Sequence, residues 1–523
     1  MSKNEIKILK NKNYSKARSL IPGEFILRSK LAIYFIPSLL FVLISCNNPT
    51  KGRIDWPYLF KKYNDDPLKK KAVLFFKENI GGISSEEVVF YNLHNEKLAN
   101  ISFNDFKKDS DLIAYLKENK LTYKIVWRKD SSILTTKFIE NAVEEACKIW
   151  KKYPWNNAVS KDLFYNFLLP YKISGEAVSP NKYLIQRYLM KVDSLAKIKT
   201  TTSRDMYQFL IKQDIKKWFS YSDSAAYFSN IPSLNELLLF KRGECFGSAL
   251  IYAYALKAVG IPATIDIVPM WGFWDGSHAE VVFADSTGRN MCPYQKDRLA
   301  GAAKVFRIGF SNHHSWSDSI KPFIGKYNFA IPFLRNDYYE DVTIQHRKTT
   351  DIHYKLPVNI KVPFAYICVY CFDKWIPLYW GKVDSIGVAI FKNMGCNNLY
   401  SVAIPNKDGG YTRVGNNFEL DSVGKMKDFV VNEHKYMNLR LTTSNCKPLS
   451  QIAIKDSISL FYLNSKNKWI LKGTITYTAD SVAVFKTIPI NTLYKLKATN
   501  RKNDNLLKLR RPFSCQDKKL RWW

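Results

Sequence analysis

The segment 243–283 constrains the fold more strongly than any other part of the chain. Cys245 stands at the start of a run whose apolar residues recur at helical spacing, and Gly260 ends that run. Residues 264–268 then alternate as a strand, and a second strand begins at His278. This order predicts an α+β core in which a thiol opens a helix and an imidazole opens a strand.

The expected places of these two side chains suit nucleophilic chemistry. The first turn of a helix leaves backbone N–H groups unpaired, and these groups and the helix dipole favour a thiolate. Lys241 and Arg242 add positive charge just upstream. A cysteine with a histidine is the minimum that a thiol nucleophile and its base require. Two other interpretations stay open: Cys245 and His278 are ordinary packing and strand-end residues, or Cys245 forms a disulfide with Cys292.

Short motifs follow one another in this segment: Gly243-Glu244-Cys245, Gly260-Ile261-Pro262 and His278-Ala279. In this order they resemble the core of the transglutaminase-like superfamily of papain-type cysteine enzymes, over residues 242–295. Upstream, 66–80 and 150–172 are similar to segments that precede the core in large multidomain transglutaminase-like lipoproteins of Gram-negative bacteria. The resemblance implies a papain-like core in which Cys245 attacks an amide carbonyl, His278 acts as general base, and a thioester forms.

The resemblance also implies an Asp that orients the histidine, in the strand that returns after a hairpin. The returning stretch 289–295 lacks the expected Asp-Pro-Thr, and Gln295 lies near its place. Gln295 is therefore the expected third residue, with Asp297 as the alternative. A glutamine amide can orient an imidazole but stabilises the imidazolium less than a carboxylate does. Asp285 lies a whole strand away from His278, roughly 20 Å at about 3.3 Å per residue, which is too far for contact.

These residues support two functions of different classes. The first is an enzyme that acts on peptide or glutaminyl amides. Hydrolysis is favoured over cross-linking, because water is always present and the sequence reveals no amine-binding site. The alternative is a non-catalytic binding or scaffold protein that retains the transglutaminase-like fold. A protein that lost its activity and kept its fold would have an incomplete triad, and here the orienting Asp is missing.

The first 45 residues have the composition of a bacterial signal peptide. A basic stretch precedes the uncharged and mostly apolar run 31–44, which is too short to span a membrane comfortably. The run ends at Cys46, and residues 43–46 look like a lipobox, in which the cysteine is acylated and becomes the new N-terminus. An uncleaved signal anchor is the alternative. We therefore expect a lipid-anchored protein of the bacterial cell envelope, either periplasmic or at the outer membrane.

The remaining chain has the patterns of a helical region, a mixed core and a β-rich half. Helical patterns occupy 67–79, 136–152, 160–168 and 182–219, around a β-like segment at 87–127. Strand-like runs separated by Gly, Pro, Asn and Asp turns are typical of antiparallel β-sandwiches and occupy 342–346, 357–362, 365–372, 388–391, 399–404, 458–463, 468–476 and 482–486. The expected domains are a signal peptide (1–45), a tether (46–55), a mainly helical region (56–235), the transglutaminase-like core (236–337) and two β-sandwich modules (338–434 and 435–523).

Composition and the remaining motifs limit the partners. The net charge is +33, but the lysines are spread along the chain without basic-aromatic clusters, so we expect no nucleic acid. The expected partners are a peptide or protein substrate, the membrane through the lipid anchor, and envelope glycans on exposed aromatic side chains. The CxxC motif at 368–371 lies in a β-rich run, which favours packing over a redox or metal site. The seven histidines show no metal-ligand spacing, and no nucleotide fingerprint is present, so we expect no metal and no cofactor.

Overall fold

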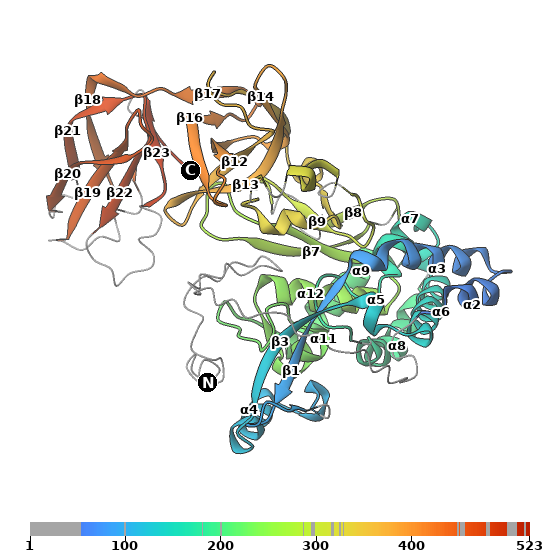
Figure 1. Cartoon of the computed structure of the whole chain (residues 1–523). Coiled ribbons are helices and arrows are strands. Elements are labelled where there is room, and N and C mark those ends of the chain that lie inside the picture. The colour runs from blue at the N-terminus through green and yellow to red at the C-terminus, as the bar shows by residue number, and fades with distance from the viewer. Residues whose placement is uncertain are drawn as a thin grey trace, which may run out of the picture. The chain divides into compact units, whose positions relative to one another are not determined.

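The computed structural model describes residues 54–523, apart from 99–100, 180, 199–200, 286, 294–298, 315–317, 324–325, 328, 447–448, 450–455, 477–481, 499–509 and 517–518 (Figure 1). The chain mixes helices with β-sheets and divides into two compact units. The first unit comprises Met1–Asp266, Ala279–Tyr294 and Ile308–His313, and the second comprises Ile267–His278, Gln295–Arg307 and His314–Trp523. The domain boundaries expected from the sequence stay predictions.

The first unit contains most of the helices. They are α2 (Trp56–Lys62), α3 (Pro67–Asn79), η1 (Ile80–Gly82), η2 (Phe103–Asp105), α4 (Asp109–Glu118), α5 (Asp130–Ile133), α6 (Thr136–Lys152), η3 (Pro154–Asn156), α7 (Lys161–Leu163), η4 (Phe164–Leu168), α8 (Lys182–Ala196), α9 (Ser203–Tyr207), η5 (Gln208–Ile215), α10 (Lys216–Trp218), α11 (Leu234–Phe240) and α12 (Cys245–Ala258). Strands β1 (Ser84–Tyr91), β2 (Lys97–Leu98) and β3 (Thr122–Lys129) form an antiparallel sheet in the order β2-β1-β3.

Two of the expected helices, α3 and α6, are confirmed, and both begin at a side-chain cap. Asp66 caps α3 by accepting a hydrogen bond from the N–H of Lys69, and Pro67 occupies the first helical position. Thr135 caps α6 in the same way. The two helices contribute buried apolar residues to one core. Each therefore has one apolar face, and the helical spacing of its apolar residues could be recognised in the sequence.

The other two helical patterns prove more finely divided than expected. The pattern at 160–168 is a short α-helix, α7, that continues into the π-helix η4. The pattern at 182–219 contains α8, α9, the π-helix η5 and α10. The helices α8 and α9 are separate because Thr202 and Asp205 form a capping box that begins a new helix. The periodicity of apolar residues alone does not show that one helix ends and a new one begins.

The helix–strand–strand order expected at 243–283 is confirmed. Helix α12 leads to β6 (Ala263–Val268) and β7 (His278–Ala284), and β7 pairs antiparallel with β8 (Met291–Pro293). With β9 (Phe306–Ile308) and β10 (Tyr339–Asp341) they form a sheet in the order β10-β9-β6-β7-β8. Helix α12 is buried on nearly all sides, as its apolar composition requires, and Gly260 ends this stretch with a φ of +81°.

The β-rich half begins with one seven-stranded antiparallel sheet in the order β11-β14-β13-β12-β15-β16-β17. Its strands are β11 (Thr349–Lys355), β12 (Phe364–Cys371), β13 (Lys374–Val383), β14 (Val388–Gly395), β15 (Asn398–Pro405), β16 (Tyr411–Leu420) and β17 (Met426–Phe429). Tyr354 on the edge strand β11 stacks on Phe418 of β16, with ring centroids 5.6 Å apart, although β16 is sixth in the sheet order. This contact requires the sheet to curl.

The curled sheet differs from the sandwich expected at 338–434. A sandwich needs a second sheet to cover the apolar face, whereas here residues from β11 to β16 enclose a shared core. Two of the predicted strands in this half are also wrong. Residues 343–346 form the helix α14 (Thr343–His346), where Asp341 accepts a hydrogen bond from the N–H of Thr343. Residues 357–362 form no strand, because proline residues bound this stretch and Ile360 N–H donates into a turn at Pro357.

The C-terminal β-module contains two sheets that share one core. Strands β18 (Asn432–Thr442) and β21 (Val482–Ile490) form one sheet. A five-stranded sheet has the order β20-β19-β22-β23-β24 and comprises β19 (Ser457–Leu463), β20 (Trp469–Thr476), β22 (Tyr494–Ala498), β23 (Phe513–Gln516) and β24 (Lys519–Trp522). Both sheets supply apolar side chains to one core, among them Leu439 and Phe485 from the first and Leu460 and Tyr494 from the second.

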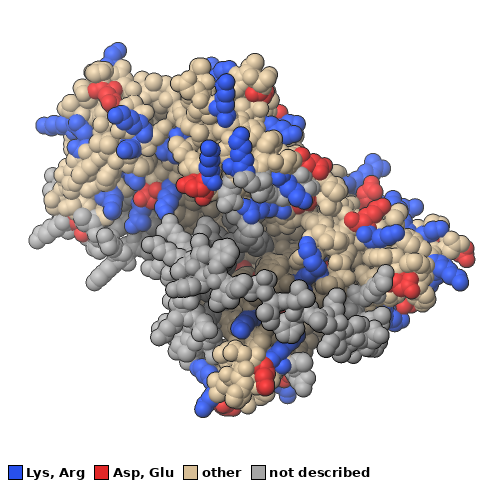
Figure 2. All heavy atoms as spheres, viewed as in Figure 1, with Lys and Arg blue, Asp and Glu red and all other residues tan. Residues whose placement is uncertain are grey.

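On the face drawn in Figure 2, Lys and Arg side chains are spread over the described surface, with Asp and Glu between them. Such a distribution is that of solvated faces and not of a concentrated basic patch. Among the residues that the structure describes, no helix combines the length and the apolar character needed to cross a bilayer.

Candidate functional site

Cys245 is the first residue of α12, and three local features fix it there. Helix α11 ends at Phe240, and its C-cap Lys241 turns the chain with a left-handed φ of 52°. Strand β5 (Arg242–Gly243) then pairs in parallel with β4 (Ser220–Tyr221). Glu244 caps α12 by accepting a hydrogen bond from Gly247 N–H at 3.3 Å. A thiol is therefore held at a helix N-terminus, as the sequence predicted.

The glycines around Cys245 allow Tyr227 to approach the backbone. A Cβ atom on Gly243 would lie 2.8 Å from the Tyr227 hydroxyl, and one on Gly247 would lie 2.5 Å from it. The hydroxyl donates a hydrogen bond to the carbonyl of Arg242 at 3.0 Å. Gly243 and Gly247 are thus required for close packing beside the first turn of α12.

The electrostatics of the thiol differ from the sequence expectation. Cys245 is only 9% exposed, and burial raises the pKa of its thiol to about 11. The backbone N–H of Ala279 bonds to the thiol and opposes this rise in pKa, while the Glu244 carboxylate adds to it. Arg242 was expected to favour a thiolate, but its guanidinium bonds Asp109 at 2.6 Å. At neutral pH the thiol is therefore protonated.

His278 is the first residue of β7, also as predicted, and its side chain is half-buried. Its ring stacks on Trp271 with centroids 5.9 Å apart and an interplanar angle of 28°. The next residue in the chain is Ala279, whose N–H reaches the Cys245 thiol. This hydrogen bond from Ala279 to Cys245 brings the start of β7 close to the start of α12.

The expected third residue, Gln295, and its alternative Asp297 lie outside the described residues, as does the lipidation residue Cys46. Asp285 closes β7 at the opposite end from His278, where its carboxylate accepts hydrogen bonds from the N–H and hydroxyl of Thr287. This confirms that Asp285 is a turn residue.

One exposed aromatic residue near Cys245 was missed in the sequence. Tyr221 pairs with Gly243 in the two-strand β4–β5 bridge, is 61% exposed, and donates its hydroxyl to Asp223 at 2.6 Å. Burial and the neighbouring Asp223 raise the pKa of Tyr221, and Cys245 also contributes. A bridge between such short strands leaves no periodic signal, so sequence reasoning could not have found this residue.

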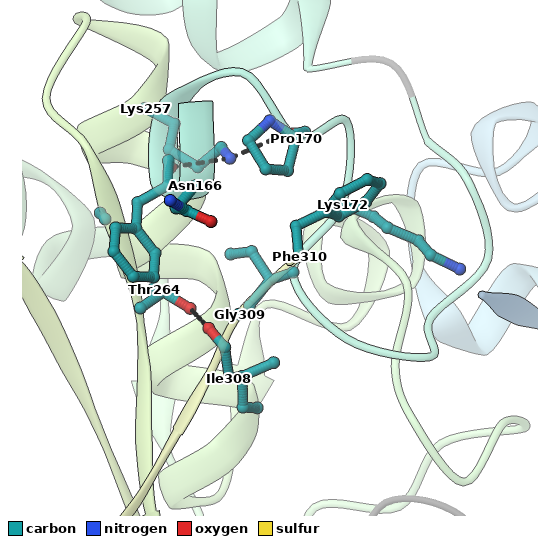
Figure 3. Close-up of a pocket in the computed structure, with 11 residues that line it drawn as sticks. Asn166, Pro170, Lys172, Lys257, Thr264, Ile308, Gly309 and Phe310 are labelled. Carbon is teal, nitrogen blue, oxygen red and sulfur yellow. Dashed lines mark hydrogen bonds between the residues drawn. The ribbon is translucent and has the colours of Figure 1, made fainter. Parts of the chain in front are cut away.

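The pocket beside the C-terminal end of α12 is too small for a substrate. Its cavity volume is about 10 Å³, the room for one water molecule, and its lining includes Lys172, Lys257 and Thr264 (Figure 3). Lys257 donates to the carbonyls of Phe167 at 3.0 Å and Pro170 at 2.8 Å. Burial lowers the pKa of this lysine to about 7. Lys257 therefore anchors α12 to the end of η4 and to Pro170, which follows it.

The other cysteines contribute packing. The thiols of Cys368 and Cys371 are both buried in β12, and burial raises their pKa values to about 12 and about 11. Neither Cys245 nor Cys292 is in a disulfide, so the alternative of a Cys245–Cys292 disulfide is wrong for this structure. Within the described ranges, no group of three or more His, Cys, Asp or Glu side chains could hold a metal ion.

Comparisons with known proteins do not identify a family for this chain. No protein-family model matches the chain, and no curated protein is significantly similar to it.

Proposed function

We propose that α12, β6 and β7 form a papain-like core of the transglutaminase-like type, and that the chain is a cysteine enzyme acting on peptide or glutaminyl amides. One observation carries the proposal. The Cys245 thiol lies at a helix N-terminus and accepts a hydrogen bond from Ala279, the residue that follows His278. A thiol, a helix N-terminus and an adjacent histidine are the parts that acyl transfer requires.

The raised pKa of Cys245 determines how the reaction begins. Because the thiol is protonated at neutral pH, its proton must pass to the His278 imidazole as the sulfur attacks the amide carbonyl carbon. The Cys245 N–H and the positive end of α12 stabilise the oxyanion. The C–N bond then breaks, the leaving amine takes the proton from His278, and a thioester remains. Water activated by His278 hydrolyses that thioester and regenerates the thiol.

The experiment is turnover of a fluorogenic peptide library and ammonia release from glutaminyl peptides. We expect Cys245→Ser to abolish both activities. Cys515→Ser is the matched control, because Cys515 lies on β23 of the C-terminal β-module and is in no disulfide, so that its substitution should leave both activities unchanged. Purified wild-type protein that turns over neither substrate class would refute the proposal.

The second candidate function is a non-catalytic scaffold, which the burial of Cys245 and the raised pKa of its thiol favour. The rate of Cys245 alkylation by iodoacetamide distinguishes an enzyme from a non-catalytic scaffold. In an enzyme, His278→Ala should slow the alkylation of Cys245, because the imidazole no longer accepts the thiol proton. In a scaffold, His278→Ala should leave the alkylation rate unchanged, and that rate should rise only as the pH approaches about 11.

The third residue of the site is part of the proposal. If Gln295 orients His278, Gln295→Ala should lower kcat and Gln295→Asp should preserve or raise it, since a carboxylate better stabilises the imidazolium. The same measurement on Asp297→Ala tests the alternative. A loss of activity in Asp297→Ala but not in Gln295→Ala would show that Gln295 is the wrong choice.

We further propose that the protein is anchored in the bacterial cell envelope through acylated Cys46. The basic stretch, the apolar run 31–44 and the lipobox-like residues 43–46 support this location. The anchor would hold the enzyme near peptide and protein substrates, and envelope glycans are a further partner for exposed aromatic side chains. The dispersed lysines give no reason to propose nucleic acid as a partner.

A further inference from the structure

The loop that precedes His278 is attached to the β12–β13 hairpin. Asp275 accepts a hydrogen bond from Phe372 N–H at 2.8 Å, and Gly276 N–H donates to the Cys371 sulfur at 3.2 Å. The loop also closes on itself, because Trp271 N–H donates to the Gly276 carbonyl at 3.1 Å. His278 is only two residues beyond Gly276, so these bonds determine where its backbone begins β7.

The hairpin turn that receives the loop is itself held in an uncommon conformation. Phe372 and Asp373 have positive φ angles of 51° and 61°, which bulky residues rarely adopt. Asp373 accepts hydrogen bonds from the Tyr370 hydroxyl and from Lys495 of β22, each at 2.6 Å. The C-terminal β-module thus supplies a charged partner that stabilises the turn.

Arg511 joins the loop, the hairpin and the end of the chain. Its guanidinium donates to the Gly272 carbonyl at 2.7 Å, to Asp275 at 3.1 Å, to the Tyr370 carbonyl, and to the Trp523 carbonyl at 2.8 Å. The residue is only 5% exposed. A planar guanidinium can satisfy several fixed acceptors at once, and a lysine cannot do so in the same geometry.

We propose that Arg511 is a positioning residue for His278. It fixes both ends of the 272–275 loop and thereby keeps the His278 ring on Trp271, so that the C-terminal β-module determines the placement of the general base. This inference rests on the proposed function for its catalytic meaning. The placement of the imidazole can be tested whether or not the protein has activity.

The test is the rate of carbethoxylation of His278 by diethyl pyrocarbonate in the full chain in detergent, followed by mass spectrometry. Exposed His94 serves as the internal reference. Arg511→Met should speed His278 modification about two- to tenfold, the equilibrium factor expected when one aromatic pair is lost. Arg511→Lys should give an intermediate rate. Asp275→Asn, which removes only the charge of one acceptor, should give a smaller increase in a folded protein.

Arg413 provides the matched control. It also donates four hydrogen bonds, to Ser401, Asn417 and twice to Asn467, and none of them involves the loop before His278. Arg413→Met should therefore leave the His278 rate unchanged even where it lowers the melting temperature. If Arg511→Met and Asp275→Asn leave the rate unchanged, or if Arg413→Met raises it equally, the inference is overturned.

Activity measurements keep the two proposals distinguishable. If the protein turns over amides, Arg511→Met should lower kcat more than it raises KM and should shift the pH profile, and Arg511→Lys should restore part of kcat. If wild-type protein is inert but Arg511→Met still exposes His278, the catalytic proposal fails and the positioning of the ring by Arg511 stands.

Discussion

Glu236→Gln should remove a pH dependence of stability from the region that leads to Cys245. Glu236 lies on α11, is fully buried, and accepts a hydrogen bond from Phe228 N–H at 2.6 Å. Ser229 donates its hydroxyl to the same carboxyl group. Burial raises the pKa of Glu236 to about 7, and the nearby carboxylate of buried Glu86 adds to the rise.

The sign and the size of the effect follow from this pKa. The ordinary pKa of the group is 4.5, so in the unfolded chain it loses its proton about 2.5 pH units below the pH at which it does so in the fold. The folded state therefore binds more protons between pH 4.5 and 7, and stability falls as the pH rises through that window. The full loss is on the order of 3 kcal/mol, since one pKa unit corresponds to about 1.4 kcal/mol.

Hydrogen–deuterium exchange of peptides covering Phe228 and Ser229 measures this loss. After correction for intrinsic exchange rates, wild-type protection should fall by about two orders of magnitude between pH 4.5 and 8. Glu236→Gln keeps acceptor and donor groups for Phe228 and Ser229 but cannot ionise, so its protection should be nearly constant. The exposed residue Glu118 offers the control Glu118→Gln. Equal pH dependence in wild type and Glu236→Gln would refute the reasoning.

Three further predictions concern other parts of the chain. Lys172→Met should lower the free energy of unfolding by about 3–5 kcal/mol, because it leaves buried Asp130 without the ammonium 2.8 Å away. The control is Lys152→Met, which breaks an exposed pair with Asp193 and should lower it by less than about 1 kcal/mol; thermal unfolding measures both. Gly301→Ala should lower the melting temperature by the equivalent of about 1–3 kcal/mol, because its Cβ would lie 1.6 Å from the Phe273 ring, while Gly473→Ala has open space and should not show this overpacking loss. Cys46→Ser should lose incorporation of radiolabelled palmitate and leave the membrane fraction, because acyl chains hold a protein by about 0.8 kcal/mol per buried methylene; label in the mutant, or its persistence in membranes at high salt, would contradict the anchor.

Local features explain which parts of the fold could be predicted from the sequence. Helices α3 and α6 begin at side-chain caps, and α12 ends near a glycine with positive φ, so each boundary is encoded within a few residues. Strands β6 and β7 were predicted from the local alternation of their residues, which is also a short-range feature. The start of each element fixes where Cys245 and His278 lie along the chain, and both were placed correctly on their elements.

Long-range contacts explain the rest. The stacking of Tyr354 on Phe418, which shows that the first β-module is a curled sheet, joins strands that are far apart in the sheet order. The pKa of Cys245 was predicted in the wrong direction, because the helix terminus and neighbouring cations were visible in the sequence and the burial of the thiol was not. Asp109, which engages Arg242, is more than a hundred residues away from it.

The proposed function of a cysteine enzyme would give the two β-modules a further role. A thiol with a pKa near 11 depends on a base that is already in place when the substrate binds, because burial gives little thiolate to react without one. The loop before His278 receives its fixed partners from β12 and from Arg511, and both belong to the β-rich half of the chain. Under the proposed positioning of His278 by Arg511, the β-modules keep the base in place for a nucleophile that is protonated at neutral pH.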